Sequence, residues 1–162
     1  MNIVLHEPEI PQNTGNIART CAATGSVLHL IEPLGFSLDE KSIRRAGLDY
    51  WHLVTVKTYQ SFEAFLKENG YPKIYMATTK SKQIYTEVHY EQRAYIMFGK
   101  ETAGIPEDIL LKYKETCIRI PMKDEARSLN LSNSVNIVLY EALRQNNFLD
   151  LQTQGQLHYY SW

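Results

Sequence analysis

Short apolar runs alternate along this chain with longer segments of helical character. Unbroken apolar runs are typical of parallel strands that are covered on both faces, and the alternation predicts crossover connections through helices. We therefore expect an α/β fold with a mostly parallel sheet and helices on both faces. The expected strands are residues 3–5, 27–31, 53–56, 73–78, 94–98 and 117–120, and the expected helices are residues 14–24, 39–46, 61–69, 106–112 and 132–145.

The 162 residues suit one domain, which we place at residues 1–150, followed by a polar and aromatic tail at residues 151–162. No apolar run approaches the roughly 18 residues that a membrane span needs, and the N-terminal residues do not read as a signal peptide. Cys21 and Cys117 lie in apolar surroundings without metal or redox spacing. We expect a cytoplasmic protein without membrane contact.

Three loops rich in polar residues and glycine follow expected strands and lead into expected helices: residues 8–19, 98–106 and 120–130. Ligands of open α/β sheets bind beyond the carboxyl ends of the strands, so these loops form the expected site. The third loop continues into a cluster of Ser and Asn residues before the last helix. Such a cluster suits a ligand-binding loop, and it equally suits a capped helix start.

Several common site motifs do not occur. There is no Gly-x-Gly-x-x-Gly, and no serine stands in a Gly-x-Ser-x-Gly elbow. Gly99-Lys100 resembles the end of a phosphate-binding loop, but Glu101 stands where Ser or Thr is needed and Ala94 where the first Gly belongs. The five histidines show no metal-ligand spacing, so we expect no metal.

Each of the three loops instead carries a pattern that resembles a signature motif of the SPOUT-class RNA 2′-O-methyltransferases. The patterns are Asn13-x-Gly-Asn-x-x-Arg19, Phe98-Gly-x-Glu-x-x-Gly-Ile-Pro106 and Ser128-Leu-Asn-Leu-Ser-Asn133. The likeness extends from Ile3 to about Arg144. The sequence at residues 33–36 and 44–50 is similar to that of the small single-domain branch of the family. Members of this branch methylate the wobble nucleotide of tRNA, which is a cytidine or a modified uridine at position 34.

The resemblance implies a C-terminal trefoil knot, a homodimer and S-adenosylmethionine as the methyl donor, with S-adenosylhomocysteine as product. Family members hold this cofactor mainly through backbone groups. The cofactor-binding positions that match here are Ala77, Gly99, Ile120, Ser128 and Leu129.

The resemblance also implies the catalytic residues Arg19, Asn13, Glu101, Ser128 and Asn130. A guanidinium stays protonated to above pH 12, so Arg19 is a poor general base. We expect it to grip the RNA phosphate and stabilise developing negative charge.

RNA contact is expected from basic side chains, because the net charge of −1 predicts no nucleic-acid partner by itself. The candidates are Arg44, Arg45, Lys80 and Arg127. Tyr140 on the last helix matches a position at the dimer interface of the family, although plain core packing would also explain it.

Three other functions stay open at this point. The chain could be a non-catalytic RNA-binding protein of the same fold, a 2′-O-methyltransferase for another RNA, or a small nucleotide-binding regulator. No residue pattern separates the target nucleotides, so cytidine and uridine both remain.

Overall fold

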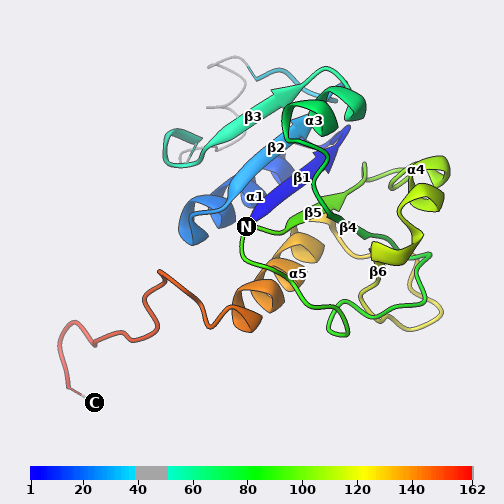
Figure 1. The fold of residues 1–162 in the computed structure, drawn as a ribbon. Helices are drawn as coiled ribbons and strands as arrows, with labels where there is room; N and C mark the ends of the chain where they lie inside the picture. The colour runs from blue at the N-terminus through cyan, green and yellow to red at the C-terminus, as the bar shows by residue number, and fades with distance from the viewer. Residues whose placement is uncertain (39–50, 162) are drawn as a thin grey trace.

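The computed structural model describes residues 1–38 and 51–161 (Figure 1). One six-stranded sheet with the order β3-β2-β1-β5-β4-β6 forms its centre, and every pairing between neighbouring strands is parallel. The strands are β1 (Asn2–His6), β2 (Val27–Ile31), β3 (Val56–Tyr59), β4 (Ile74–Ala77), β5 (Tyr95–Phe98) and β6 (Cys117–Ile118). The described helices are α1 (Pro11–Thr24), α3 (Phe62–Glu68), α4 (Glu107–Lys112) and α5 (Leu131–Gln145), with 3-10 turns at Trp51–Leu53 and Lys114–Thr116.

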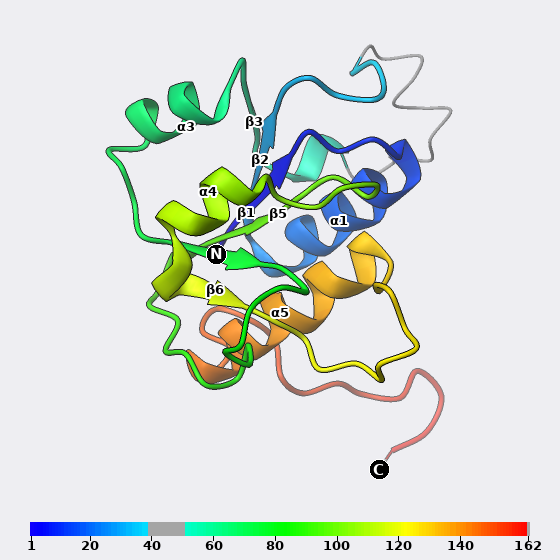
Figure 2. The same ribbon diagram turned by 90° about the vertical axis from the view of Figure 1, so that its right-hand side faces the viewer.

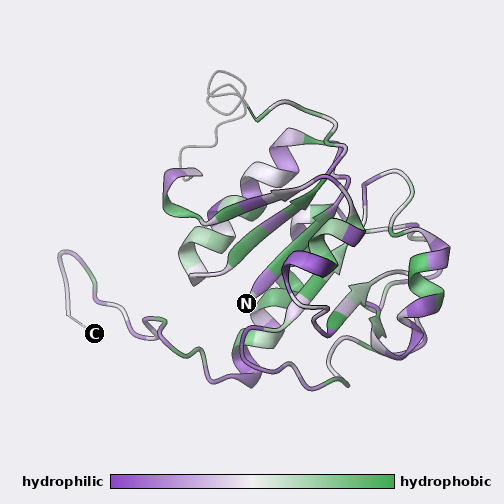
Figure 3. Cartoon of the chain, turned by 45° about the horizontal axis from the view of Figure 1, so that its top comes forward, coloured by the Kyte–Doolittle hydropathy of each residue, from purple (hydrophilic) through white to green (hydrophobic). Residues whose placement is uncertain are grey.

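Helices cover both faces of the sheet, as the apolar runs predicted (Figure 2). Ile3 and Leu5 of β1 pack on the side of α1 and α5, whereas Val4 between them packs with residues of α3 and α4. Successive side chains of a strand point to opposite faces, so an unbroken apolar run supplies both cores. Figure 3 shows this apolar character along the strands, with polar residues on the outer surfaces.

Local signals set the helix ends. Ser61 Oγ accepts a hydrogen bond of 3.1 Å from Ala64 N and caps α3. Gly25 ends α1 in the left-handed conformation at φ 62°, and its N–H donates to the Cys21 carbonyl. Pro11 opens α1 three residues before the expected start at residue 14, because proline suits a first helical turn.

The strand predicted at residues 53–56 is wrong in position. Trp51–Leu53 form a 3-10 turn, and β3 runs from Val56 to Tyr59 instead. Lys57 and Thr58 in the middle of β3 are exposed, because β3 is an edge strand. These polar residues interrupt the apolar pattern by which the other strands were predicted. The strand predicted at residues 117–120 ends at Ile118, after which Arg119 forms an isolated bridge with Ile84. The helix predicted at residues 39–46 lies outside the described residues.

The connection between β4 and β5, residues 78–94, passes along α5 rather than forming a helix of its own. Gln145 near the end of α5 accepts a hydrogen bond from Tyr90 N at 3.0 Å and donates one to the Val88 carbonyl at 3.0 Å. Tyr90 itself is fully buried against the core. This connection therefore fastens the C-terminal end of α5.

Residues 152–161 extend away from the sheet (Figure 1). The two tyrosines of this segment, Tyr159 and Tyr160, are 90% and 81% exposed. Across the described residues, no helix combines the length and the hydrophobicity needed to cross a membrane.

Candidate active site

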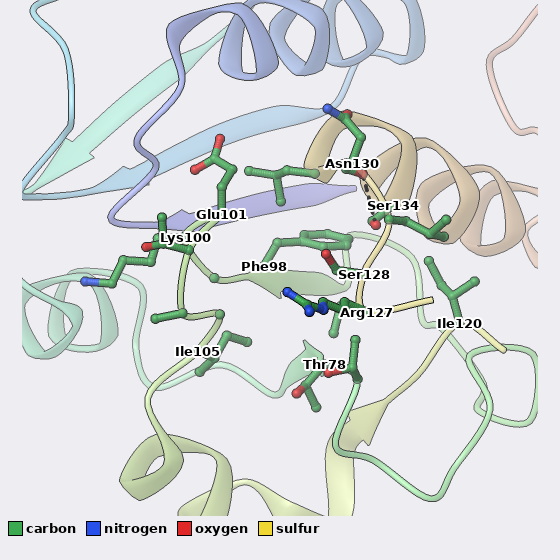
Figure 4. Close-up of a pocket in the computed structure, with 18 of the residues that line it drawn as sticks. Thr78, Phe98, Lys100, Glu101, Ile105, Ile120, Arg127, Ser128, Asn130 and Ser134 are labelled. Atoms are coloured by element: carbon green, nitrogen blue, oxygen red, sulfur yellow. Dashed lines mark hydrogen bonds between the residues drawn. The ribbon is translucent and has the colours of Figure 1, made fainter. Parts of the chain in front are cut away.

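A cavity of about 580 Å³ lies beyond the carboxyl ends of β4 and β5, where the three polar loops converge (Figure 4). Its apolar wall comes from strand ends and from the second and third loops. These side chains are Phe98, Ile105, Ile120, Met122 and Leu129. Polar lining comes from the first turn of α1, from residues 78–80 and from residues 127–134. An apolar wall with a few polar groups at its edges is typical of a small-molecule site.

Asn13 and Glu101 join the first loop to the second. Asn13 Nδ2 donates to Glu101 Oε1 at 2.9 Å. The Glu101 carboxylate also accepts from the backbone N–H of Glu9 at 2.8 Å and from that of Ile10 at 3.3 Å. Glu101 thus satisfies N–H groups that precede α1, so its carboxylate is directed at the start of this helix.

Asn130 extends the same network to the third loop. Its Nδ2 donates to Asn13 Oδ1 at 2.9 Å, while its Oδ1 accepts from Ser132 N at 2.9 Å and from Ser132 Oγ at 2.7 Å. Asn130 is also the N-cap of α5. The Ser and Asn cluster therefore does both things that its sequence suggested: it caps the helix and borders the cavity.

A second pair of contacts fastens the same loops. Glu9 accepts hydrogen bonds from Thr102 N at 3.0 Å and from Thr102 Oγ1 at 2.8 Å. Sequence reasoning missed both residues. Glu9 belongs to the first loop, but no signal in the sequence pairs it with a residue 93 positions away.

Gly99 lets the second loop fold back on itself. A Cβ built at this position would lie 2.0 Å from the Gly104 carbonyl carbon and 2.1 Å from Ile105 N. Gly104 closes the turn with φ 72° and donates its N–H to the Lys100 carbonyl at 2.8 Å. Only a residue without a side chain fits at Gly99, so the loop that walls the cavity depends on it.

Two of the cations around the cavity are held by carboxylates. Lys80 Nζ lies 2.7 Å from Glu107 Oε1, and Lys100 Nζ lies 2.9 Å from Glu7 Oε2. The hydrogen bond to Glu7 raises the pKa of Lys100, and the hydrogen bond from Lys80 lowers the pKa of Glu107. A carboxylate therefore balances the charge of each of these two lysines.

Comparison with known proteins agrees with this geometry. The model of the SpoU rRNA Methylase family matches residues 1–140. The chain belongs to this family.

Individual SpoU-family proteins are similar over nearly the whole chain. The tRNA (cytidine(34)-2'-O)-methyltransferase of Escherichia coli strain K12 is 50% identical over 146 residues, which cover 90% of this chain and 93% of that protein. A Listeria monocytogenes protein that carries the same name provisionally is 51% identical over 150 residues, which cover 91% of this chain and 89% of that protein. A solved Bacillus anthracis structure, provisionally named an RNA methyltransferase, superposes with a TM-score of 0.90 at 48% identity, covering 95% and 99% of the two chains.

The fold of this SpoU-family protein brings most of the candidate site residues to one cavity. The candidates that line it are Asn13, Ala77, Lys80, Gly99, Glu101, Ile120, Arg127, Ser128, Leu129 and Asn130. Ala77 is the last residue of β4 and Gly99 directly follows β5, which places their backbone at the carboxyl edge of the sheet.

Arg19 is not among the described residues that line the cavity. It is exposed on α1, between one and two helical turns beyond Asn13. Arg44 and Arg45 lie outside the described residues. Within the described part of this SpoU-family chain, no group of three or more His, Cys, Asp or Glu residues could hold a metal ion.

Proposed function

We propose that this protein transfers a methyl group from S-adenosylmethionine to the ribose 2′-hydroxyl of tRNA nucleotide 34, a cytidine or a modified uridine. The observation that carries this proposal is the 50% identity to a tRNA (cytidine(34)-2'-O)-methyltransferase over 93% of that enzyme's length. The cavity built from the three motif loops supplies a place for the reaction.

The cavity suits the donor in size and chemistry. Its volume of about 580 Å³ falls in the range of roughly 300–1,000 Å³ that is usual for ligand sites. Ile105, Ile120 and Leu129 offer apolar contact to an adenine ring. We assign the directed contacts to the backbone at Ala77, Gly99, Ile120 and Ser128. The peptide groups of Ala77 and Gly99 stand at the ends of β4 and β5, where the sheet already holds them in place.

Positioning supplies most of the catalysis in this proposal. Bound S-adenosylmethionine would supply an activated methyl group and depart as S-adenosylhomocysteine. The chain must then hold the 2′-hydroxyl in line with that methyl group, which is worth several orders of magnitude in rate. We assign the positioning of the hydroxyl to Arg19, which would bind the neighbouring phosphate, and to Ser128 and Asn130 beside the cavity. Asn13 and Glu101 would hold the three loops together.

We further propose that the protein is a homodimer. Arg19 and Tyr140 are exposed on α1 and α5, two helices that pack against each other, and Tyr140 is 47% exposed. A second copy on this face would cover Tyr140 and extend the surface that holds the RNA.

The trefoil knot is also part of the proposal. Its support is the position of α5, which is fastened to the connection at residues 78–94 although that connection precedes it by about 40 residues. A chain end that passes behind an earlier loop is the arrangement that a knot requires.

Basic side chains would contact the tRNA in the cytoplasm. We assign this contact to Lys80, Arg44 and Arg45. Because the chain carries a net charge of −1, binding would depend on these local charges and on salt.

A methyl-transfer assay tests the function. Purified protein, labelled S-adenosylmethionine and tRNA from cells lacking the protein should give one labelled nucleoside, mapped to position 34 by mass spectrometry. The control is the same tRNA carrying a 2′-deoxy residue at position 34, which should take up no label. Label at another position would favour a methyltransferase for another site, and tRNA binding without transfer would favour a non-catalytic RNA-binding protein.

A further inference from the structure

Three cationic residues are among the described residues that line the cavity, and they differ in what balances their charge. Lys80 pairs with Glu107 and Lys100 pairs with Glu7. Arg127 is exposed, and it makes no ion pair with any residue of the described part of the chain, its acidic neighbours Asp124 and Glu125 included. Arg127 is therefore the cavity cation whose guanidinium is available to a ligand.

Arg127 stands at an electropositive end of the cavity. It precedes Ser128, and Figure 4 shows its guanidinium directed over the cavity. The N-terminus of the 15-residue helix α5, which the Asn130 side chain caps, lies at the same end, where Leu131 and Ser134 line the cavity. A helix N-terminus carries a partial positive charge, which adds to that of the guanidinium.

No carboxylate of the described lining opposes this charge. Glu101 is the one acidic residue among the described residues that line the cavity. Its oxygens already accept hydrogen bonds from Glu9 N, Ile10 N and Asn13 Nδ2, so they are directed away from a ligand. A ligand with one anionic group would place that group at the Arg127 end.

We propose that Arg127 binds the carboxylate of the methionine part of the donor. The inference rests on the proposed function, because it takes S-adenosylmethionine as the ligand. This donor carries a single carboxylate, and a guanidinium pairs with a carboxylate through two parallel hydrogen bonds. Arg127 is then a donor-binding residue that orients the sulfonium methyl group, instead of the RNA contact that its sequence suggested.

Calorimetry with two ligands tests this assignment. The ligands are S-adenosylhomocysteine and its decarboxylated analogue, which lacks only the carboxylate. Arg127→Gln should weaken binding of S-adenosylhomocysteine roughly 10- to 100-fold and leave binding of the analogue unchanged, because the variant removes a charged hydrogen-bond pair. Arg127→Lys should recover part of the loss. Lys73→Gln is the matched control, because Lys73 pairs with Glu91 and is not among the described residues that line the cavity, so it should change neither affinity.

The outcomes separate the possible roles of Arg127. An equal loss for both ligands would indicate a purely structural role and overturn the assignment. Unchanged binding of S-adenosylhomocysteine together with weaker tRNA binding would make Arg127 an RNA contact and overturn it as well. If the wild-type protein bound neither ligand, the proposed function would fail together with the inference, whereas a defect confined to Arg127→Gln leaves that function standing.

Discussion

The side-chain amide of Asn13 donates a hydrogen bond of 2.9 Å to Glu101 Oε1 and so connects two loops that lie 88 residues apart in sequence. Asn130 donates to the other end of the same Asn13 side chain, also at 2.9 Å. One amide therefore links all three motif loops around the cavity. Movement of any one loop would disturb the other two, which makes the network a sensitive place for substitution.

Glu101→Gln should destabilise the protein by roughly 1–3 kcal/mol, because one carboxylate oxygen becomes an N–H donor that faces other donors. Weaker binding of S-adenosylhomocysteine should accompany the loss, since the loops that wall the cavity are no longer held together. Urea unfolding and calorimetry measure the two effects. Glu107→Gln, at an exposed carboxylate paired with Lys80, is the control and should shift stability by less than about 0.5 kcal/mol. Wild-type stability in Glu101→Gln would argue against the network.

Gly99→Ala should cost about 1–3 kcal/mol or more, because its methyl group would overlap the backbone of Gly104 and Ile105. Removing this overlap requires the second loop to move away from the cavity, so the affinity for the methyl donor should fall as well. Thermal unfolding with and without S-adenosylhomocysteine measures both. Gly155→Ala, in the tail with open space around its Cβ position, should behave as wild type. A fully stable Gly99→Ala would show that the loop tolerates another path.

Arg19→Ala should lower turnover about 10²-fold, with the affinity for S-adenosylhomocysteine nearly unchanged, because Arg19 lies outside the donor cavity. The turnover of Arg19→Lys should lie between that of the wild type and that of Arg19→Ala, since a lysine keeps the charge but cannot form two parallel hydrogen bonds with a phosphate. Single-turnover assays and calorimetry separate the effects. Wild-type turnover in Arg19→Ala would remove Arg19 from the mechanism.

Stability should fall as the pH drops from about 6.5 to 4, because His29 is buried in a neutral form. Its ring lies 2.8 Å from the Tyr59 hydroxyl and 3.1 Å from Asn2 Oδ1. Burial lowers the pKa of His29 from 6.5 to about 4. Below pH 6.5 the unfolded chain binds a proton on His29 that the folded chain does not bind. The free energy of unfolding is therefore unaffected by His29 above pH 6.5 and decreases as the pH falls toward 4.

The size of this effect is roughly 3 kcal/mol across the window, given about 1.4 kcal/mol for each pKa unit. Urea unfolding between pH 7.5 and 4 measures it. His29→Gln should give a shallower pH dependence, whereas His158→Gln in the exposed tail should keep the wild-type slope. An unchanged slope in His29→Gln would assign the acid sensitivity to another group.

Tyr140→Asp should produce a monomer with little loss of thermal stability, because this side chain is 47% exposed and contributes little to the core. A charge placed at the centre of an apolar interface is costly to bury. Light scattering after gel filtration measures the mass. Tyr159→Asp, at the 90% exposed tail tyrosine, should remain dimeric. A dimeric Tyr140→Asp variant would place the interface elsewhere.

Much of the fold was predictable because its strands are covered on both faces. For this reason the run at Tyr95–Phe98 is unbroken and the run at Val27–Ile31 is apolar except for His29, and the structure confirms both as strands. Strand β3 was misplaced because it lies at the sheet edge, where Lys57 and Thr58 remain exposed. Pairing with β2 selects Val56–Tyr59 as the strand, and that pairing is a long-range contact which no local pattern encodes.

By itself, the sequence determined the α/β class and the positions of the three polar loops, because apolar periodicity and helix caps are local properties. Only the tertiary structure decided which side chains meet. The parallel pairing of β5 with β1 sets the second loop beside the first, so that Glu101 reaches Asn13 and Thr102 reaches Glu9. The path of the chain from β6 to α5 sets Arg127 over the cavity, whereas Arg19 lies on α1 and is not among the described residues that line it. Such contacts depend on strand order and chain path, which are properties of the whole packed chain.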